Sequence, residues 1–264
     1  MSGSLRVGII GGAGWLGSAI GSSLIRASVV DPACLSLSYR SRQPQSFPQS
    51  FWTRDNQELV DRSDVVILSV RPQDWPAVAI DLGGKLLISV MAGSRIEALS
   101  ARHATPRVVR ALPNAAAEVS HSYTPWVASD AVGEEDRAVV RTIFEACGVE
   151  DEVASEGEID YFTGLTGSGP AFPALLAAAM AAHAGKSGIA ADVACRAVLT
   201  SLIGTGRLLE RHAQCPQDIV AAFLDYRGTT AAAIEAMRAG GFDKAVSMGL
   251  DAAFSKSVSM GGAS

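Results

Sequence analysis

Short apolar runs alternate with helical or mixed segments along the first half of the chain. Six short runs are mainly apolar, and most of them do not alternate strictly with polar positions: residues 5–10, 35–39, 65–70, 86–91, 108–112 and 123–128. Strands of this kind are typical of a sheet that helices cover on both faces. Residues 18–27, between the first two runs, have helical spacing. Because strands and helices alternate, the pattern predicts an α/β domain with a doubly wound parallel sheet.

The pattern changes after about residue 155. Residues 134–147 still have helical spacing, but from about residue 164 the chain becomes Ala-rich and its strand signals disappear. Helix-length segments then follow one another to the end of the sequence. We therefore expect two domains, an α/β domain over residues 1–158 and an all-helical domain over residues 159–264.

Composition narrows the classes of function. The chain has 264 residues, of which 48% are hydrophobic and 19% are charged, with a net charge of −5. This composition excludes a disordered chain, and the low charged fraction suggests that a subunit interface covers part of the surface. A pI of about 5.4 argues against nucleic acid as a partner, because phosphate binding needs clustered Lys and Arg.

Signals for a membrane, for export and for a metal are missing. No apolar run reaches the roughly 18 residues of a spanning helix, since the longest candidate, residues 171–182, contains Pro173 and stops at His183. The N-terminus does not have the pattern of a signal peptide. The four cysteines show no CxxC pairing, and no two histidines have metal-ligand spacing. We expect a cytoplasmic protein with no metal site and no membrane contact.

A glycine-rich turn follows the first apolar run. Residues 7–20 read VGIIGGAGWLGSAI, in which Gly12, Gly14 and Gly17 fit G-x-G-x-x-G between a strand and a helix. The first glycine permits a tight turn, the second lets the backbone approach a pyrophosphate, and the third lets the helix pack closely. Phosphates then sit at the helix N-terminus, where N–H groups and the dipole attract an anion. Gly11 makes this turn one residue longer than the common form, and the alternative to dinucleotide binding is a structural turn. The cofactor-binding residues predicted from the turn are Gly12, Ala13, Gly14, Trp15, Leu16 and Gly17.

The end of the second predicted strand indicates which dinucleotide binds. An NAD enzyme usually carries an acid about 20 residues after the turn to hold the ribose 2′-hydroxyl. This sequence instead reads SLSYRSRQP, with Arg40 and Arg42 on either side of Ser41. A guanidinium suits a 2′-phosphate, so we predict NADP(H) in preference to NAD(H). The alternative is that both arginines are solvated surface residues.

Five further segments resemble one protein family in their order along the chain. They are residues 63–72 (SDVVILSVRP), 89–93 (SVMAG), 107–114 (RVVRALPN), 163–172 (TGLTGSGPAF) and 228–230 (GTT). They are similar to the family's Val-Lys-Pro strand end, Ala-Gly turn, Arg-Val-Met-Pro-Asn segment, Ser-Gly-Ser-Gly-Pro-Ala motif and Ser-Pro-Gly-Gly-Thr-Thr loop. Together they make nearly the whole chain resemble the pyrroline-5-carboxylate reductases.

The resemblance implies an activity and an assembly. It implies an oxidoreductase that transfers a hydride from NADPH to the C=N carbon of a cyclic imino acid. The expected substrate is 1-pyrroline-5-carboxylate, which becomes L-proline in proline biosynthesis. The resemblance also implies a Rossmann NADP-binding domain followed by a helical dimerisation domain, and therefore a homodimer or a larger homo-oligomer.

The resemblance carries roles toward the cofactor onto particular residues. The residues expected at its 2′-phosphate end are Arg40, Ser41 and Asn56. Those expected along its middle are Val70, Arg71, Pro72, Ala92 and Gly93. The residue expected near the nicotinamide is Asn114.

Toward the substrate, the resemblance makes Thr230 the catalytic residue, which would hydrogen-bond the imine nitrogen. Gly228 and Thr229 would help to hold the carboxylate. A protonated imine is already electrophilic, so no strong general acid is required if a hydroxyl or water relays one proton. The alternative is a simple helix start that the threonines cap.

The loop before Gly228 departs from the family pattern. Where the family has Ser-Pro-Gly, this chain has Asp225, Tyr226 and Arg227. Arg227 could clamp a carboxylate, and Asp225 could neutralise Arg227 or select an amine-bearing substrate, unless both point to solvent. The exact substrate therefore stays open. The alternatives are reduction of a different imine or ketone on the same fold, a non-catalytic NADP-binding regulatory protein, and another Rossmann oxidoreductase such as a deazaflavin-linked NADP reductase.

Overall fold

A computed structural model of the chain describes residues 4–212 and 215–261. The chain divides into two compact units. The first comprises the residues up to Ser168 together with those from Ala252 onward, and the second is Gly169–Asp251. The expected functional division between residues 158 and 159 stays a prediction.

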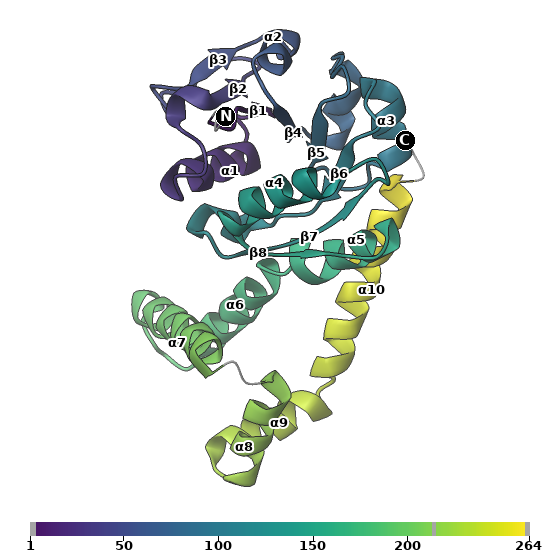
Figure 1. The fold of residues 1–264 in the computed structure, drawn as a ribbon. Coiled ribbons are helices and arrows are strands. Elements are labelled where there is room, and N and C mark those ends of the chain that lie inside the picture. The colour runs from purple at the N-terminus through teal and green to yellow at the C-terminus, as the bar shows by residue number, and fades with distance from the viewer. Residues whose placement is uncertain (1–3, 213–214, 262–264) are drawn as a thin grey trace. The chain divides into compact units, whose positions relative to one another are not determined.

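The described part of the first unit holds an eight-stranded sheet in the order β3-β2-β1-β4-β5-β6-β7-β8 (Figure 1). Its strands are β1 Val7–Ile10, β2 Leu35–Ser38, β3 Phe51–Thr53, β4 Val65–Leu68, β5 Leu86–Ser89, β6 Val108–Ala111, β7 Ser122–Ala128 and β8 Gly148–Glu152. Neighbouring strands are parallel except β6 and β7. The chain leaves β1 toward β2 on one side and reaches β4 on the other. Such a switch point is where open α/β sheets bind ligands.

Helices cover both faces of the sheet (Figure 1). The helical segments of this unit are α1 Trp15–Arg26, η1 Pro32–Cys34, α2 Asn56–Asp61, η2 Pro72–Ala77, α3 Ile96–His103, η3 Ala115–Val119, α4 Glu134–Glu145, α5 Glu156–Phe162 and the π-helical turn η4 Thr163–Gly167. Ile9 and Ile67 pack in the core that α1 and α4 cover, whereas Ile10 and Leu68 pack in the core that α2 and α3 cover. Successive side chains of a strand point to opposite faces of the sheet, so strands with apolar residues at consecutive positions make both faces apolar.

The predicted fold class, a doubly wound sheet followed by a helical part, is confirmed. Each of the six predicted apolar runs overlaps a strand, but the prediction omitted β3 and β8. β3 has three residues, and β8 reads GVEDE, so neither presents an apolar run. β8 lies at the sheet edge, where charged residues discourage pairing with another chain.

The second unit is helical over its described residues. Its elements are α6 Ala171–Lys186, α7 Ala191–His212, α8 Pro216–Asp225, α9 Thr229–Ala239 and the first part of α10 Phe242–Gly261, which ends in the first unit. Helix α6 packs against α7, and α8 packs against α9. The apolar side chains buried among the described residues of this unit are Ala194, Val198 and Ala231.

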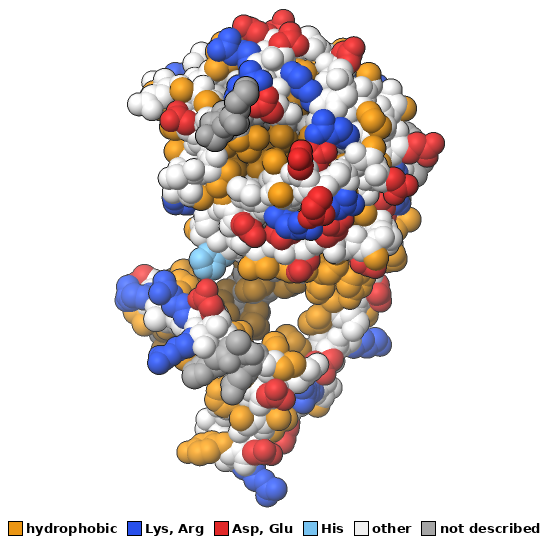
Figure 2. Space-filling model, viewed as in Figure 1, with side chains coloured by type: hydrophobic (Ala, Val, Ile, Leu, Met, Phe, Trp, Pro, Cys, Tyr) orange, Lys and Arg blue, Asp and Glu red, His pale blue; other side chains and the backbone are white. Residues whose placement is uncertain are grey.

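Large apolar side chains of the second unit are instead exposed, as the orange side chains over its helices show (Figure 2). Leu175 is 72% exposed and Ile203 is 60% exposed. Exposed apolar side chains in such number indicate a site of interaction. The described helices of this unit therefore present an apolar surface that a further layer could cover.

One helical run is long and apolar enough to cross a membrane, by length and composition alone. It spans Glu156–Lys186, 31 residues, with a mean hydropathy of 1.3 in its most apolar window. The expectation that no segment reaches spanning length is wrong by this criterion. The helix continues from α5 through η4 into α6, so small neutral residues join the apolar ones in a single run.

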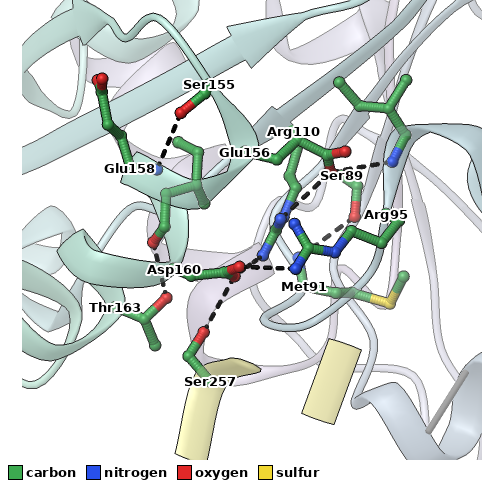
Figure 3. A network of polar contacts seen from close by, with 12 residues as sticks. Ser89, Met91, Arg95, Arg110, Ser155, Glu156, Glu158, Asp160, Thr163 and Ser257 are labelled. Carbon is green, nitrogen blue, oxygen red and sulfur yellow. Dashed lines mark hydrogen bonds and ion pairs between the residues drawn. The ribbon is translucent and has the colours of Figure 1, made fainter. Parts of the chain in front are cut away.

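A buried ion-pair network joins four elements of the first unit (Figure 3). The Asp160 carboxylate on α5 accepts hydrogen bonds from Arg110 Nη2 at 2.7 Å, Arg95 Nη2 at 2.8 Å and Ser257 Oγ at 3.2 Å. Glu156 Oε1 accepts from Arg110 Nη1 at 3.2 Å. Because Arg110 is on β6 and Ser257 is on α10, the network ties α5 and the last part of α10 to the sheet.

Candidate functional site

A cavity of about 570 Å³ lies at the carboxyl ends of β1, β2 and β4. It is therefore at the switch point of the sheet, where the fold places ligands. Among its lining residues are seven of the predicted cofactor residues: Ala13, Gly14, Arg40, Ser41, Asn56, Val70 and Arg71. Their convergence on one cavity from separate stretches of the sequence makes this the candidate cofactor site.

The turn that closes one side of the cavity depends on Gly11. This residue has a φ of +83°, and a Cβ there would lie 2.3 Å from the Ser69 carbonyl oxygen. Its N–H donates to Ser38 Oγ at 3.0 Å, and its carbonyl accepts from Gly14 N–H at 2.9 Å. The prediction gave the tight turn to Gly12, and this assignment is wrong, because the left-handed conformation is one residue earlier. The extra glycine is thus the residue that makes the turn possible.

Helix α1 begins directly after the turn. It starts at Trp15, three residues before the predicted start, and Gly14 is its N-cap residue with no side chain to occupy the helix end. Gly17 permits close packing, because a Cβ there would lie 2.6 Å from the Gly11 carbonyl oxygen. Trp15 is exposed and donates its Nε1–H to Glu118 Oε2 at 3.2 Å, while Leu16 packs partly against the core. These two residues can therefore serve a phosphate through the backbone only.

Cations surround the opposite end of the cavity. Arg40, Arg42 and Arg54 all line it, beside Ser41 and Asn56. Arg54 Nη2 donates to the Ser41 carbonyl oxygen at 2.6 Å, so this side chain braces the loop after β2. The set fits a phosphate, because guanidinium groups and polar donors converge there. A cavity with glycines at one end and arginines at the other thus fits a dinucleotide with a 2′-phosphate.

Two charged lining residues were missed from the sequence, Arg54 and Asp74. Arg54 follows β3, and Asp74 lies in η2 after β4. Arg40 Nη1 pairs with Asp74 Oδ1 at 3.1 Å. Their positions in the sequence could have indicated a role at the site, because residues that follow neighbouring parallel strands meet at one edge of the sheet. This signal could not be used for Arg54, because β3 itself was not predicted.

The remaining predicted cofactor residues lie apart from this cavity. Pro72, Ala92 and Gly93 line a second cavity of about 620 Å³ in the first unit. Asn114 caps η3 by accepting from Ala116 N–H at 2.9 Å, and its Nδ2 donates to the Thr166 carbonyl oxygen at 3.0 Å. Both polar ends of its amide are thus engaged within the protein.

The predicted substrate residues lie in the second unit, at the start of α9. Gly228 is the N-cap residue, and neither threonine caps the helix through its side chain. Thr230 lines a cavity of about 520 Å³ together with Asp218 and Tyr226. Arg227 has a φ of +52°, the left-handed conformation that glycine adopts more readily. The family glycine at this position fits the backbone that the structure shows.

The fold and the first cavity together define a dinucleotide-binding protein of the Rossmann class with a helical C-terminal part. The family model described as pyrroline-5-carboxylate reductase dimerisation matches residues 156–260, and the one described as NADP oxidoreductase, coenzyme F420-dependent, matches residues 6–93. A pyrroline-5-carboxylate reductase of Synechocystis is 30% identical over 266 residues, which cover 98% of this chain and 99% of that protein. The chain belongs to the pyrroline-5-carboxylate reductase family, which confirms the resemblance of its motifs.

Solved structures agree with this assignment. The 1-pyrroline-5-carboxylate reductase of Streptococcus pyogenes is 28% identical, with a TM-score of 0.84 over 97% of this chain and 98% of that one. The pyrroline carboxylate reductase of Plasmodium falciparum, solved with NADP bound, has a TM-score of 0.86 over 97% of this chain and 98% of that one. At 24% identity, the second likeness concerns the fold. The family consists of oxidoreductases, so the chain is assigned to an enzyme class.

Proposed function

We propose that the chain is an NADPH-dependent reductase that converts 1-pyrroline-5-carboxylate to L-proline. The observation that carries the proposal is the cavity at the switch point, with a glycine turn at one end and Arg40, Arg42 and Arg54 at the other. The substrate follows from the family, whose relatives are named for this reaction. Residues 1–158 would bind the cofactor, and residues 159–264 would form the dimer and contribute to the substrate site.

We assign different parts of NADPH to different predicted residues, some of which line the first cavity and some of which lie outside it. The N-terminus of α1 would hold the pyrophosphate, because Gly14 leaves the helix end open to an anion. Arg40, Ser41 and Asn56 would hold the 2′-phosphate. Val70, Arg71, Pro72, Ala92, Gly93 and Asn114 would lie along the ribose and nicotinamide. When bound, NADPH supplies the hydride, while the protein supplies orientation and electrostatics.

The start of α9 would hold the substrate. The Thr230 hydroxyl would hydrogen-bond the imine nitrogen and relay the proton that this nitrogen carries. Gly228 and Thr229 lie at the N-terminus of an 11-residue helix, whose N–H groups and dipole favour a carboxylate. Arg227 would add a cation beside that carboxylate, at the cost of a left-handed backbone that a glycine would adopt without strain.

The exposed apolar face of the second unit supports a homodimer or larger homo-oligomer. Only three apolar side chains are buried among the described residues of that unit, and the dimerisation model matches the same region. The run Glu156–Lys186 is within this match, so we assign its apolar side chains to a partner subunit and not to lipid. We place the protein in the cytoplasm, without membrane or nucleic-acid partners.

The decisive assay follows the nicotinamide absorbance of NADPH mixed with the purified protein and pyrroline-5-carboxylate. Turnover supports the proposal. Turnover with other cyclic imines but not with this one would assign the altered loop at Asp225–Arg227 to a different substrate. Tight NADPH binding without turnover on any imine would indicate a regulatory protein.

Thr230→Ala tests the site. We expect turnover to fall about 10-fold or more with NADPH affinity unchanged, because the hydroxyl serves the substrate and not the cofactor. Thr142→Ala is the matched control, since Thr142 is exposed on α4 and its hydroxyl donates to the Ala138 carbonyl within its own helix. Equal activity of the two variants would remove Thr230 from the mechanism.

A further inference from the structure

The candidate 2′-phosphate end of the cavity contains a carboxylate. Asp74 lines the cavity and pairs with Arg40, with 3.1 Å between Asp74 Oδ1 and Arg40 Nη1. Among the lining residues that the structure describes, Asp74 is the only acid. An acid is unexpected beside a phosphate, because the two negative charges repel.

The backbone of Asp74 is held in a helical turn. The residue is in the first turn of η2, which begins at Pro72, and its N–H donates to the Arg71 carbonyl oxygen at 2.9 Å. Arg40 is held less firmly, because its side chain is 84% exposed whereas that of Asp74 is 39% exposed. The carboxylate, on a short side chain from an ordered turn, is thus the less mobile partner, and the longer, more exposed guanidinium is the partner that can turn away.

The loop that carries Arg40 has a second support. Arg54 Nη2 donates to the Ser41 carbonyl oxygen at 2.6 Å, and its guanidinium lies 5.3 Å from the centre of the Tyr39 ring. The backbone of the loop is therefore braced without Asp74. Loss of the Asp74 carboxylate would free the Arg40 side chain while the loop keeps its support.

We propose that Asp74 is a specificity-determining residue, a counter-ion that competes with the 2′-phosphate of NADPH for Arg40. This inference rests on the proposed function, because it takes the cavity to be the NADP(H) site. A phosphate monoester carries roughly −1.5 to −2 charges at neutral pH and displaces the single carboxylate. The neutral 2′-hydroxyl of NADH cannot do so. The Arg40–Asp74 pair therefore weakens NADPH binding and leaves NADH binding nearly unaffected. It thus reduces the preference of the site for NADPH over NADH.

The expected effect is modest, because exposed ion pairs are weak in water. Asp74→Asn keeps the side-chain shape and removes the charge. We expect it to lower the Kd for NADPH about two- to fivefold and to leave the Kd for NADH within about twofold. The gain should shrink as salt is added, since the groups are solvent-exposed.

The test measures Kd for NADPH and NADH by titration calorimetry at low ionic strength, without an imine substrate. It uses the wild type, Asp74→Asn, Arg40→Met and the double variant. Asp130→Asn is the matched control, because Asp130 is an exposed acid outside the cavity and its loss changes the net charge equally. We expect the gain in NADPH affinity from Asp74→Asn to disappear in the Arg40→Met background, because the carboxylate acts through Arg40.

Two results would overturn the inference alone. One is an Asp74→Asn variant with unchanged or weaker NADPH binding. The other is a gain of the same size in the Arg40→Met background or in Asp130→Asn, which would indicate a general effect of charge. Wild-type protein that binds neither nucleotide would overturn the proposed function as well. Wild-type protein that shows the expected affinities but does not turn over pyrroline-5-carboxylate would overturn the proposed reaction and leave this inference intact.

Discussion

Removal of the Asp160 charge should destabilise the first unit strongly. Its side chain is 2% exposed, and its three hydrogen-bond donors come from Arg110, Arg95 and Ser257 (Figure 3). Asp160→Asn keeps the shape but leaves two guanidinium groups against the one carboxylate of Glu156. Breaking a buried ion pair on one side costs about 3–5 kcal/mol. We expect about 3 kcal/mol, the lower end of that range, because Arg95 is one-third exposed and can turn to water.

Urea unfolding followed by tryptophan fluorescence measures this loss. All four tryptophans of the chain are in the first unit, so the signal reports on that unit. At an m-value of about 2 kcal/mol per molar urea, a loss of about 3 kcal/mol lowers the unfolding midpoint by about 1.5 M. Protein concentration must be held constant, because association would contribute to stability.

Two variants calibrate the result. Ser257→Ala removes one neutral donor and should cost only about 1 kcal/mol. Asp64→Asn breaks the exposed pair with Arg6 and should cost much less than Asp160→Asn, because water replaces the lost partner. The reasoning is refuted if Asp160→Asn is no more destabilising than Asp64→Asn, since the network would then not hold α5 and α10 to the sheet.

Two further predictions concern the turn and a buried histidine. Gly11→Ala should weaken NADPH binding more than 10-fold in calorimetry, because its Cβ would overlap the Ser69 carbonyl. The control is Gly83→Ala, at a φ of +54° with open space around it, which should cost only about 1 kcal/mol of backbone strain and leave NADPH binding intact. Equal losses of NADPH binding in the two variants would contradict the assigned role of Gly11. His103 is buried, and its Nε2 accepts the Trp75 Nε1–H at 2.8 Å; burial lowers the pKa of its imidazole. The contribution of the neutral imidazole to folding stability is therefore complete above about pH 6.5 and is lost as the pH falls through the lowered pKa of the folded state. The unfolding free energy of the wild type should therefore fall relative to that of His103→Gln between pH 8 and pH 5, and parallel curves would show that His103 does not titrate in this way.

Much of the fold was predictable from local pattern. Residues 65–68 and 86–88 are apolar at every position, which is typical of a strand with two covered faces, and they fall in β4 and β5. The pattern could not reveal β8, because its acidic residues suit an exposed edge and its pairing with β7 is set by tertiary contacts. It also gave no sign that Arg110 is fully buried, since the carboxylates that neutralise it are 46 and 50 residues away.

The candidate site was predictable in part. Arg40, Ser41 and Asn56 could be proposed from the sequence because they follow recognisable positions, and the structure places them around one cavity. Gly11 was noticed but given no task, because the sequence does not state which of three nearby glycines takes the positive φ. Arg54 and Asp74 were absent from the prediction, because their nearness to Arg40 exists only once β2, β3 and β4 lie side by side.

The sequence by itself determined the family, the α/β class, the glycine turn and the preference for a 2′-phosphate. These properties depend on residue types at short spacings, which survive without knowledge of the folded chain. The tertiary structure decided which glycine makes the turn, which charges face each other and which apolar side chains the chain leaves uncovered. Charge pairs and burial depend on distances between residues far apart in the sequence, so the opposition of Asp74 and Arg40 could only be read from the folded sheet.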